Sequence, residues 1–324
     1  MTVPLPRTAL VTGVAGFIAS HLAQALLDRG TRVTGVDRRS PETDADAATN
    51  LAGCLDRPGF TLARADLLDC PLAPLLDAAD VVFHLAGIPG VRASWGTRFP
   101  DYVAGNILAT HRIAAACHQL GVPRLVVASS SSVYGPVGDR PVTEDAPTHP
   151  ASPYGVTKLA AEQLALAYGT LPQPRTTVVA LRYFTVYGPR QRPDMLIQRA
   201  LRAAAGGEKL LVYGDGNQRR DFTYVGDVVR ATLRAAAAPG TAEVLNVAGG
   251  HSASVAEVLA TIAALTGRPV PTRTVPDQPG DVPGTWADTG RARSRLNWRP
   301  KTALADGLAR QLDWLRSHQL GGHR

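Results

Sequence analysis

Tyr154 and Lys158 stand four residues apart and follow a run of four serines, Ser129 to Ser132. Residues at this spacing lie on one face of a helix, which predicts that the ammonium group lies close to the phenol. A nearby positive charge favours the ionised form of a phenol and therefore lowers its pKa. A phenol tuned in this way can take and return an alcohol proton near neutral pH. The pair therefore predicts general acid/base chemistry.

The serine run follows an apolar stretch, Arg124 to Ala128, which is typical of a buried parallel strand. The serine hydroxyls then emerge at the carboxyl end of that strand. Open α/β sheets bind their ligands at this edge. We therefore expect the serines to lie beside a bound ligand.

A turn with two glycines joins the first predicted strand, Thr8 to Thr12, to a helical pattern that ends at Gly30. Gly13 permits the tight turn, and Gly16 lets the backbone approach a pyrophosphate, whose charge meets free amide groups at the helix start. Ala19 occupies the helix-packing position, where alanine can replace glycine. This order of features predicts a dinucleotide-binding site.

The second predicted strand, Arg32 to Val36, ends at Asp37, about twenty residues beyond the glycines. A carboxylate at this place can accept hydrogen bonds from an adenosine ribose and repels a 2′-phosphate, which favours NAD over NADP. The adjacent Arg38 and Arg39 weaken that preference, because arginines here can also hold a 2′-phosphate.

Strands alternate with helical patterns through the first half of the chain, which predicts an α/β fold with a doubly wound parallel sheet. Within this pattern we expect His84 to be a packed strand residue rather than a base. Asn106 lies on an otherwise apolar helix face and needs hydrogen-bond partners. The further segments are strands at Phe60 to Ala65, Val81 to Leu85 and Thr176 to Leu181, and helices at Tyr102 to Leu120 and Thr302 to Gln319.

The bulk composition is that of an ordinary globular protein, with a net charge of +7. This charge suits either electrostatic steering of a phosphorylated ligand or an arginine-rich composition without functional meaning. The basic residues are spread along the chain, so we expect no nucleic-acid partner. No apolar run reaches the ~18 residues of a membrane span, and no signal peptide is visible. The three cysteines lack metal or redox spacing, so we expect a cytoplasmic protein without a metal or a membrane partner.

The order of the motifs resembles that of extended short-chain dehydrogenases/reductases, in the group of sugar-nucleotide epimerases and dehydratases. The resemblance extends from Thr8 to Trp314. The matching segments are Thr12-Gly13-x-x-Gly16-Phe-Ile, Asp66-Leu67, His84-Leu-Ala-Gly87, Asn106, the serine run, Tyr154-x-x-x-Lys158, Leu181-Arg-Tyr-Phe184, Arg220-Asp-Phe-x-Tyr-Val225 and Asn297-Trp-Arg-Pro300.

The resemblance implies a Rossmann-type NAD-binding domain with a smaller mixed α/β substrate lobe, and a homodimer. We expect residues 1–182, with a return segment 220–248, to form the NAD-binding domain. Residues 183–219 and 249–324 then form the nucleotide-sugar lobe.

Roles for individual residues also follow from the resemblance. Catalysis is assigned to Ser130, Tyr154 and Lys158. Cofactor binding is assigned to Gly13, Gly16, Phe17, Ile18, Asp37, Arg38, Asp66, Leu67, Leu85, Ala86, Gly87, Asn106, Tyr154 and Lys158. Substrate binding is assigned to Arg92, Ser130, Ser131, Ser132, Thr185, Arg192 and Arg220.

The residues after Ser130 distinguish between the reactions of this group. Members that resemble 4,6-dehydratases carry Asp-Glu where this chain has Ser131 and Ser132, and decarboxylases of nucleotide-linked glucuronate carry a glutamate at the second place. This chain has neither acid. Without a base for the C5 proton, a 4-keto sugar has little to do except take its hydride back, which favours an isomerase, a 4-epimerase.

The stretch from Phe184 to Met195 is similar to UDP-glucuronate 4-epimerases, because Thr185 stands where glucose and galactose 4-epimerases usually have asparagine. The alternatives are a UDP-glucose or UDP-N-acetylglucosamine 4-epimerase and, in another class, a non-catalytic NAD-sensing protein. Arg192 then faces either a C6 carboxylate, or the diphosphate or solvent.

Arg220 matches the family's arginine on the nucleotide diphosphate. A second family arginine, expected just before Gly280 and Asp281, is absent, and Asp277 and Gln278 stand nearby instead.

Overall fold

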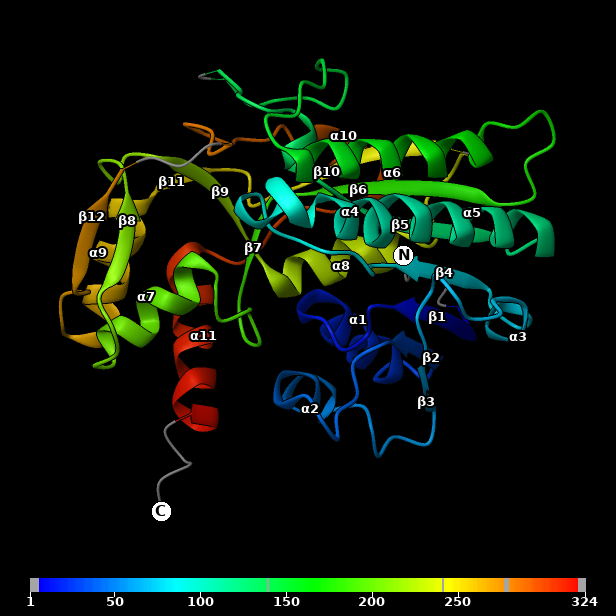
Figure 1. The fold of residues 1–324 in the computed structure, drawn as a ribbon, viewed down its shortest axis with the longest axis horizontal. Coiled ribbons are helices and arrows are strands. Elements are labelled where there is room, and N and C mark those ends of the chain that lie inside the picture. The colour runs from blue at the N-terminus through cyan, green and yellow to red at the C-terminus, as the bar shows by residue number, and fades with distance from the viewer. Residues whose placement is uncertain (1–5, 139, 241, 277–279, 320–324) are drawn as a thin grey trace.

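The computed structural model describes residues 6–138, 140–240, 242–276 and 280–319. Its main sheet has seven parallel strands in the order β3-β2-β1-β4-β5-β6-β10 (Figure 1). The first six follow the Rossmann order and β10 extends the sheet, which confirms the predicted fold class. The strands are β1 (Thr8–Thr12), β2 (Arg32–Asp37), β3 (Phe60–Arg64), β4 (Val81–His84), β5 (Arg124–Ser130), β6 (Thr177–Tyr183) and β10 (Ala242–Val247).

The predicted strand boundaries differ from the observed ones by at most two residues, and those of β1 agree. The largest difference is at β5 and β6, which both continue two residues beyond the expected ends, because Ser129 and Ser130 pair with Arg182 and Tyr183. The serine run therefore begins inside the sheet rather than after it.

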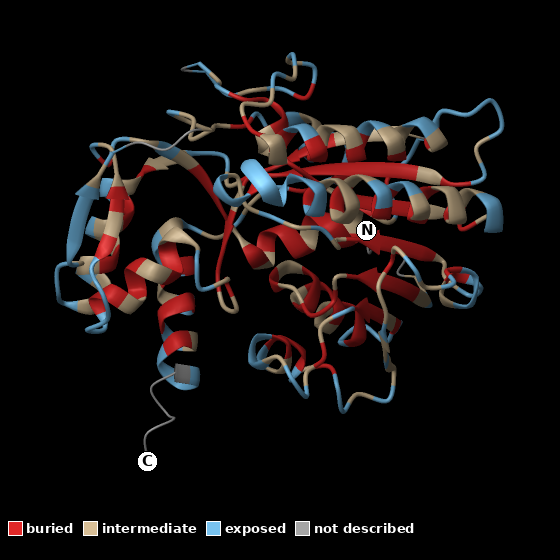
Figure 2. Cartoon of the chain, viewed as in Figure 1, coloured by how far each residue is buried: buried red, intermediate tan, exposed pale blue. Residues whose placement is uncertain are grey.

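Helices cover both faces of this sheet and bury its central strands (Figures 1 and 2). One face packs against α1 (Phe17–Leu27), α2 (Ala45–Leu51), α8 (Val225–Ala235) and α10 (Gly290–Leu296). The other packs against α3 (Ala73–Leu76), α5 (Ala109–Leu120) and α6 (Pro153–Gly169). Burial on both faces explains why the strands read as nearly continuous apolar runs.

The helix expected from Tyr102 begins earlier and is not uniform. It runs through α4 (Phe99–Tyr102), a π-helical segment η3 (Val103–Leu108) and α5. Short π segments often occur at functional sites. Asn106 lies in η3, where its side chain bonds the loop after β4.

The smaller lobe contains two small sheets. β7 (Thr185–Tyr187), β9 (Arg219–Tyr224) and β11 (Ser252–Ser254) form one, and β8 (Leu210–Tyr213) and β12 (Thr272–Val275) form the other. Helices α7 (Leu196–Ala204), α9 (Val255–Thr266) and α11 (Leu304–Gln319) share a core with them. Helix α11 begins two residues later than expected.

The chain passes between these two parts more than once. Strand β9 pairs with β7 and β11, whereas α8 packs on α1, and β10 pairs with β6. The lobe boundaries given above remain a prediction.

Among the described residues, no helix is long and apolar enough to cross a membrane. No group of three His, Cys, Asp or Glu side chains within the same residues is placed to hold a metal ion.

Candidate active site

The end of β5 and the start of α6 come together through a glycine. After β5 the chain enters a short 3₁₀ helix, η4 (Ser131–Val133), in which the Ser132 amide donates to the Ser130 hydroxyl at 3.1 Å. Ser152 caps α6 by accepting from the Gly155 amide at 3.1 Å. A Cβ atom at Gly155 would lie 2.5 Å from the Ser132 carbonyl oxygen, so the close approach needs glycine. This approach places Tyr154 beside Ser130, and their side chains hydrogen bond.

The backbone and the ring of Tyr154 are both fixed by neighbouring elements. The Tyr154 amide donates to the Ser94 hydroxyl at 3.0 Å. Its ring meets the ring of Tyr102 edge to face, with centroids 6.3 Å apart. The Tyr154 ring is therefore held in a defined orientation.

The environment of Tyr154 acts on its acidity in opposing ways. Burial raises the pKa of the phenol, while the Ser130 hydrogen bond and the Arg192 charge lower it. We expected Lys158 to be the cation that lowers this pKa. That role of Lys158 stays a prediction, and Arg192, from the loop after β7, is a further cation that lowers the pKa of the phenol. The spacing of four placed the lysine on the same helix face but could not reveal an arginine that arrives from elsewhere.

Lys158 is buried, with an exposed fraction of 8%. Burial lowers its pKa to about 8, and the Glu162 carboxylate opposes this fall. A Cβ atom at Gly87 would lie 4.0 Å from the lysine nitrogen, so the ammonium faces the loop after β4.

Asn106 connects that loop to helix α6. Its carbonyl oxygen accepts from the Ile88 amide at 2.7 Å, and its Nδ2 donates to the Ile88 carbonyl at 3.1 Å and to Thr157 Oγ1 at 3.0 Å. A Cβ atom at Gly87 would lie 2.8 Å from Asn106 Oδ1. The expected partners of this buried amide are thus present.

His84 is a packed strand residue, as expected. Its Nδ1 lies 2.8 Å from Thr12 Oγ1 and its Nε2 lies 3.0 Å from Thr110 Oγ1. Thr110 donates its own hydroxyl proton to the backbone carbonyl of Asn106. Its oxygen can therefore only accept from His84, so the histidine carries its proton on Nε2. Burial and the Lys158 charge lower its pKa to about 3, which keeps the ring neutral.

The glycine turn after β1 has the geometry of a phosphate cradle. Gly13 has φ +68°, and a Cβ atom there would lie 2.8 Å from Ala86 Cα. The Gly16 amide donates to the Gly13 carbonyl at 2.8 Å, and no side chain caps α1 at Gly16. The first amides of α1, at Phe17 and Ile18, therefore remain without a side-chain cap and can receive a pyrophosphate.

Asp37 lies at the end of β2, beside this turn. Its carboxylate accepts from the Ala15 amide at 3.0 Å and the Arg39 amide at 2.9 Å. Arg38 is exposed and lies 3.8 Å from the Asp66 carboxylate. Leu67, Leu85 and Ala86 follow β3 and β4 at the same edge, so the turn, the acid and the apolar residues together fit NAD.

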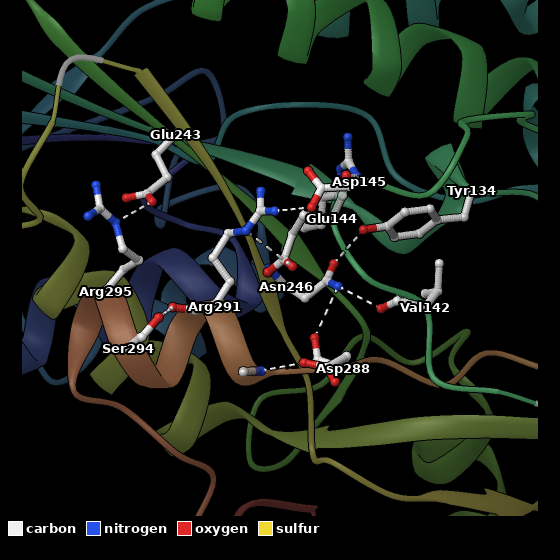
Figure 3. Close-up of polar contacts among 12 residues, drawn as sticks. Tyr134, Val142, Glu144, Asp145, Glu243, Asn246, Asp288, Arg291, Ser294 and Arg295 are labelled. Atoms are coloured by element: carbon white, nitrogen blue, oxygen red, sulfur yellow. Dashed lines mark hydrogen bonds and ion pairs between the residues drawn. The ribbon is translucent and has the colours of Figure 1, made fainter.

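The turn that follows the serine run is anchored by Asn246 (Figure 3). Asn246 Oδ1 accepts from the Tyr134 hydroxyl at 2.7 Å, and Nδ2 donates to the carbonyls of Val142 at 3.0 Å and Asp288 at 3.2 Å. The Asn246 amide donates to Glu144 Oε1 at 2.8 Å. This network holds the segment between Ser132 and α6 against β10.

The substrate-side residues gather from three segments. Ser131 and Ser132 lie in η4, and Thr185 begins β7 directly after β6, the neighbour of β5. Arg192 donates from Nε and Nη2 to the two Asp194 oxygens at 2.9 and 2.8 Å. Burial lowers the pKa of Arg192, but the Asp194 carboxylate outweighs it and raises that pKa.

Arg92 and Arg220 form a second cationic group. Arg92 donates to Asp281 Oδ2 at 2.8 Å and its guanidinium lies 3.7 Å from the ring centroid of Tyr213. Burial lowers the pKa of Arg220, Asp281 raises it and Arg92 lowers it, so these three charges are close together. Asp277 and Gln278 lie outside the described residues.

Three residues of this site were missed by the motifs. Ser94 and Tyr102, which hold Tyr154, carry no local signal. Glu162, which acts on Lys158, could have been found by extending the spacing of four by one more step along α6.

The family model described as "NAD dependent epimerase/dehydratase family" matches residues 9–248. The protein of Bacillus subtilis described as "Uncharacterized UDP-glucose epimerase YtcB" is 41% identical over 314 residues, which cover 95% of this chain and 98% of that protein.

Two solved structures are also similar over nearly the whole chain. MoeE5 in complex with UDP-glucuronic acid and NAD is 47% identical with a TM-score of 0.88, covering 96% of this chain and 99% of its own. UDP-glucuronic acid 4-epimerase from Bacillus cereus, in complex with UDP-glucuronic acid and NAD, is 39% identical with a TM-score of 0.90 and the same coverage. The predictions of an isomerase and of NAD as its cofactor are confirmed. The chain belongs to the NAD dependent epimerase/dehydratase family.

Proposed function

We propose that this enzyme is a 4-epimerase that interconverts UDP-glucuronate and UDP-galacturonate through a transient 4-keto sugar. The observation that carries the proposal is the position of Arg192, which is close enough to Tyr154 to lower the pKa of its phenol. A guanidinium at this place can pair with a carboxylate on the sugar that reacts at Tyr154.

Tyr154 is the proposed acid/base group. As the phenolate it takes the proton from the sugar O4, and the Ser130 hydroxyl, hydrogen bonded to it, shares that proton. NAD, when bound, would supply reversible hydride transfer at C4. Lys158 would hold the nicotinamide ribose, and Tyr154 gives the proton back to O4 at the end of the reaction.

The 4-keto sugar must turn about its link to the diphosphate to present its other face. Ser131 and Ser132 offer hydroxyls rather than carboxylates, so no acid at these positions removes the C5 proton. Hydride return is then the productive route, and the reaction has no net redox change.

Two groups of arginines bind the two anionic parts of the substrate, the C6 carboxylate and the diphosphate. Arg192, with hydroxyls of Thr185 and the serine run, receives the C6 carboxylate. Arg92 and Arg220 receive the diphosphate, and Arg92 supplies the charge of the family arginine that is absent before Gly280. Asp281 holds Arg92 in place at the rim of this group.

A UDP-glucose 4-epimerase is the second candidate. It is supported by the name of the Bacillus subtilis relative and by a further structure of MoeE5, in complex with UDP-glucose and NAD, at 48% identity. A neutral C6 group would leave Arg192 paired with Asp194 alone.

The deciding experiment compares kcat/KM for UDP-glucuronate, UDP-glucose and UDP-N-acetylglucosamine without added nicotinamide cofactor. We expect a clear preference for UDP-glucuronate. A preference for either neutral sugar would refute the substrate assignment, and bound NAD without turnover of any of them would support the NAD-sensing alternative.

We also propose that the enzyme is a homodimer. Leu108, Leu120 and Val156 are large apolar side chains left exposed on η3, α5 and α6, and a contact between two copies of the chain would bury them. Light scattering that gives the mass of a single chain would contradict this.

A further inference from the structure

Helix α6 carries three functional-group side chains at a spacing of four: Tyr154, Lys158 and Glu162. They share one helix face. Glu162 is fully buried, with an exposed fraction of 0%, yet the proposed chemistry gives it no role.

The Glu162 carboxylate is bonded from two strands. It accepts from the Ser129 hydroxyl at 2.6 Å, and from Arg182 Nε and Nη2 at 2.9 and 2.7 Å. Ser129 and Arg182 are direct partners across β5 and β6. The carboxylate therefore joins α6 to the last residues of β5, one position before Ser130.

Arg182 is itself held in place on its other sides. Its guanidinium lies 4.7 Å from the ring centroid of Tyr134 and donates from Nη1 to the Glu144 carbonyl at 3.2 Å. Tyr134 and Glu144 belong to the Asn246 network (Figure 3). The direction of the Glu162 carboxylate is thus determined by a rigid, hydrogen-bonded set of neighbours.

Stability alone is a poor reason for this ion pair. Taking two charges out of water carries a large desolvation cost, and well-packed apolar pairs are often as stable. What distinguishes Glu162 is its place, one helical turn below a buried lysine and next to the strand end that carries the catalytic serine.

Glu162 is the negatively charged group among the charged and titratable neighbours of Lys158. His84 of β4 is neutral, Tyr154 lies one turn above, and the Arg182 charge of β6 lies beyond Glu162 and is neutralised by it. Glu162 is the carboxylate that acts on the lysine, against the effect of burial.

We propose that Glu162 is a positioning residue, whose charge keeps the Lys158 ammonium protonated in its buried site and whose bond to Ser129 fixes the strand end that carries Ser130. The proposal rests on the acid/base chemistry of the proposed function, but not on the identity of the sugar.

The test measures two pH profiles in Glu162→Gln and Glu162→Asp. One is kcat with whichever nucleotide sugar the wild type converts, and the other is the affinity for NAD by calorimetry. An opposite charge within about 4–6 Å shifts a pKa by roughly 1 to 3 units. In Glu162→Gln we therefore expect the alkaline fall of both profiles to move to lower pH by about 1 unit or more.

Glu162→Asp separates charge from structure. It keeps the charge but shortens the side chain, so the alkaline fall should stay near that of the wild type even if kcat is lower. Glu208→Gln makes the same chemical change at an exposed position and should move neither profile. If Glu162 had a purely structural role, Glu162→Gln and Glu162→Asp would lower kcat alike, and the alkaline fall of both profiles would keep its wild-type position. That result would overturn the proposal.

Two further outcomes are distinguishable. If the wild type converts no nucleotide sugar, the proposed function fails, and the NAD profiles still decide the role of Glu162. If Glu162→Gln does not fold, the variant Ser129→Ala tests the proposal instead, because it removes the hydrogen bond between Ser129 and Glu162 without removing a charge. We then expect a lower kcat with KM and the alkaline fall unchanged, and an unchanged kcat would contradict the proposal.

Discussion

Arg192 is the residue at which the two candidate substrates differ most. Its contact with Asp194 uses Nε and Nη2, so the side of the guanidinium that carries Nη1 has no bond within that ion pair. Arginine can hold two carboxylates at once through these separate edges. Asp194 can thus orient Arg192 while the sugar carboxylate takes the other edge.

We predict that Arg192→Ala lowers kcat/KM for UDP-glucuronate about 10- to 100-fold relative to UDP-glucose, since hydrogen bonds to charged groups contribute roughly 1.5 to 3 kcal/mol. Arg192→Lys should recover little if the contact is two-pronged. Arg273→Ala, at an exposed position on β12, is the control. A constant ratio of the two kcat/KM values in Arg192→Ala would place this arginine outside the sugar site.

At the scale of elements, the loop from Gly188 to Asp194 is held from both sides. On one side, Arg190, with φ +64°, donates to Gln24 Oε1 at 2.5 Å, and His21 lies 2.8 Å from the Pro189 carbonyl. These contacts tie the loop to α1.

On the other side, three buried glutamines tie the same loop to α7 and α11. Gln311 accepts from the Gly188 amide at 2.9 Å and donates to Gln191 at 2.9 Å and Gln198 at 2.8 Å. The loop that carries Arg192 thus depends on a helix more than a hundred residues later.

We predict that Gln311→Leu lowers the free energy of unfolding by about 1 to 3 kcal/mol, because the buried Gly188 amide loses its acceptor. Gln119→Leu is the matched control, since it makes the same change at an exposed position of α5. Urea denaturation measures both. Equal stability of Gln311→Leu and the wild type would show that the glutamine cluster does not hold the loop.

At the scale of the whole molecule, burial of neutral His84 makes stability depend on pH. Its pKa is about 3 in the folded chain, whereas an unfolded histidine has a pKa near 6.5. Between these values the unfolded state binds the extra proton, so stability rises with pH across the window and is lost as pH falls.

We predict that unfolding becomes easier from pH 6.5 toward pH 5, by at most about 1.4 kcal/mol per pH unit for this histidine. His84→Gln should flatten that dependence, although His21, whose pKa is lowered to about 4, leaves some of it. His251→Gln, at an exposed position, is the control and should leave the pH dependence of stability unchanged. The same slope in His84→Gln and the wild type would rule out His84 as its source.

Most of the cofactor half could be predicted from the sequence, because its signals are local. The strand, glycine turn, helix and acid around Gly13 and Asp37 are set by backbone conformation and by periodicity within a few dozen residues. The same holds for the Tyr154 and Lys158 pair, whose common helix face follows from their spacing alone.

The neighbours of these groups were decided by the tertiary structure. Arg192 acts on Tyr154 from a loop 38 residues later, Arg92 meets Asp281 across 189 residues of chain, and Glu162 of α6 meets Arg182 of β6. Local patterns specify which element forms and which face is buried. Which charged side chains meet at the edge of the sheet depends on how separate elements pack, and that information is absent from the spacing of residues within any one of them.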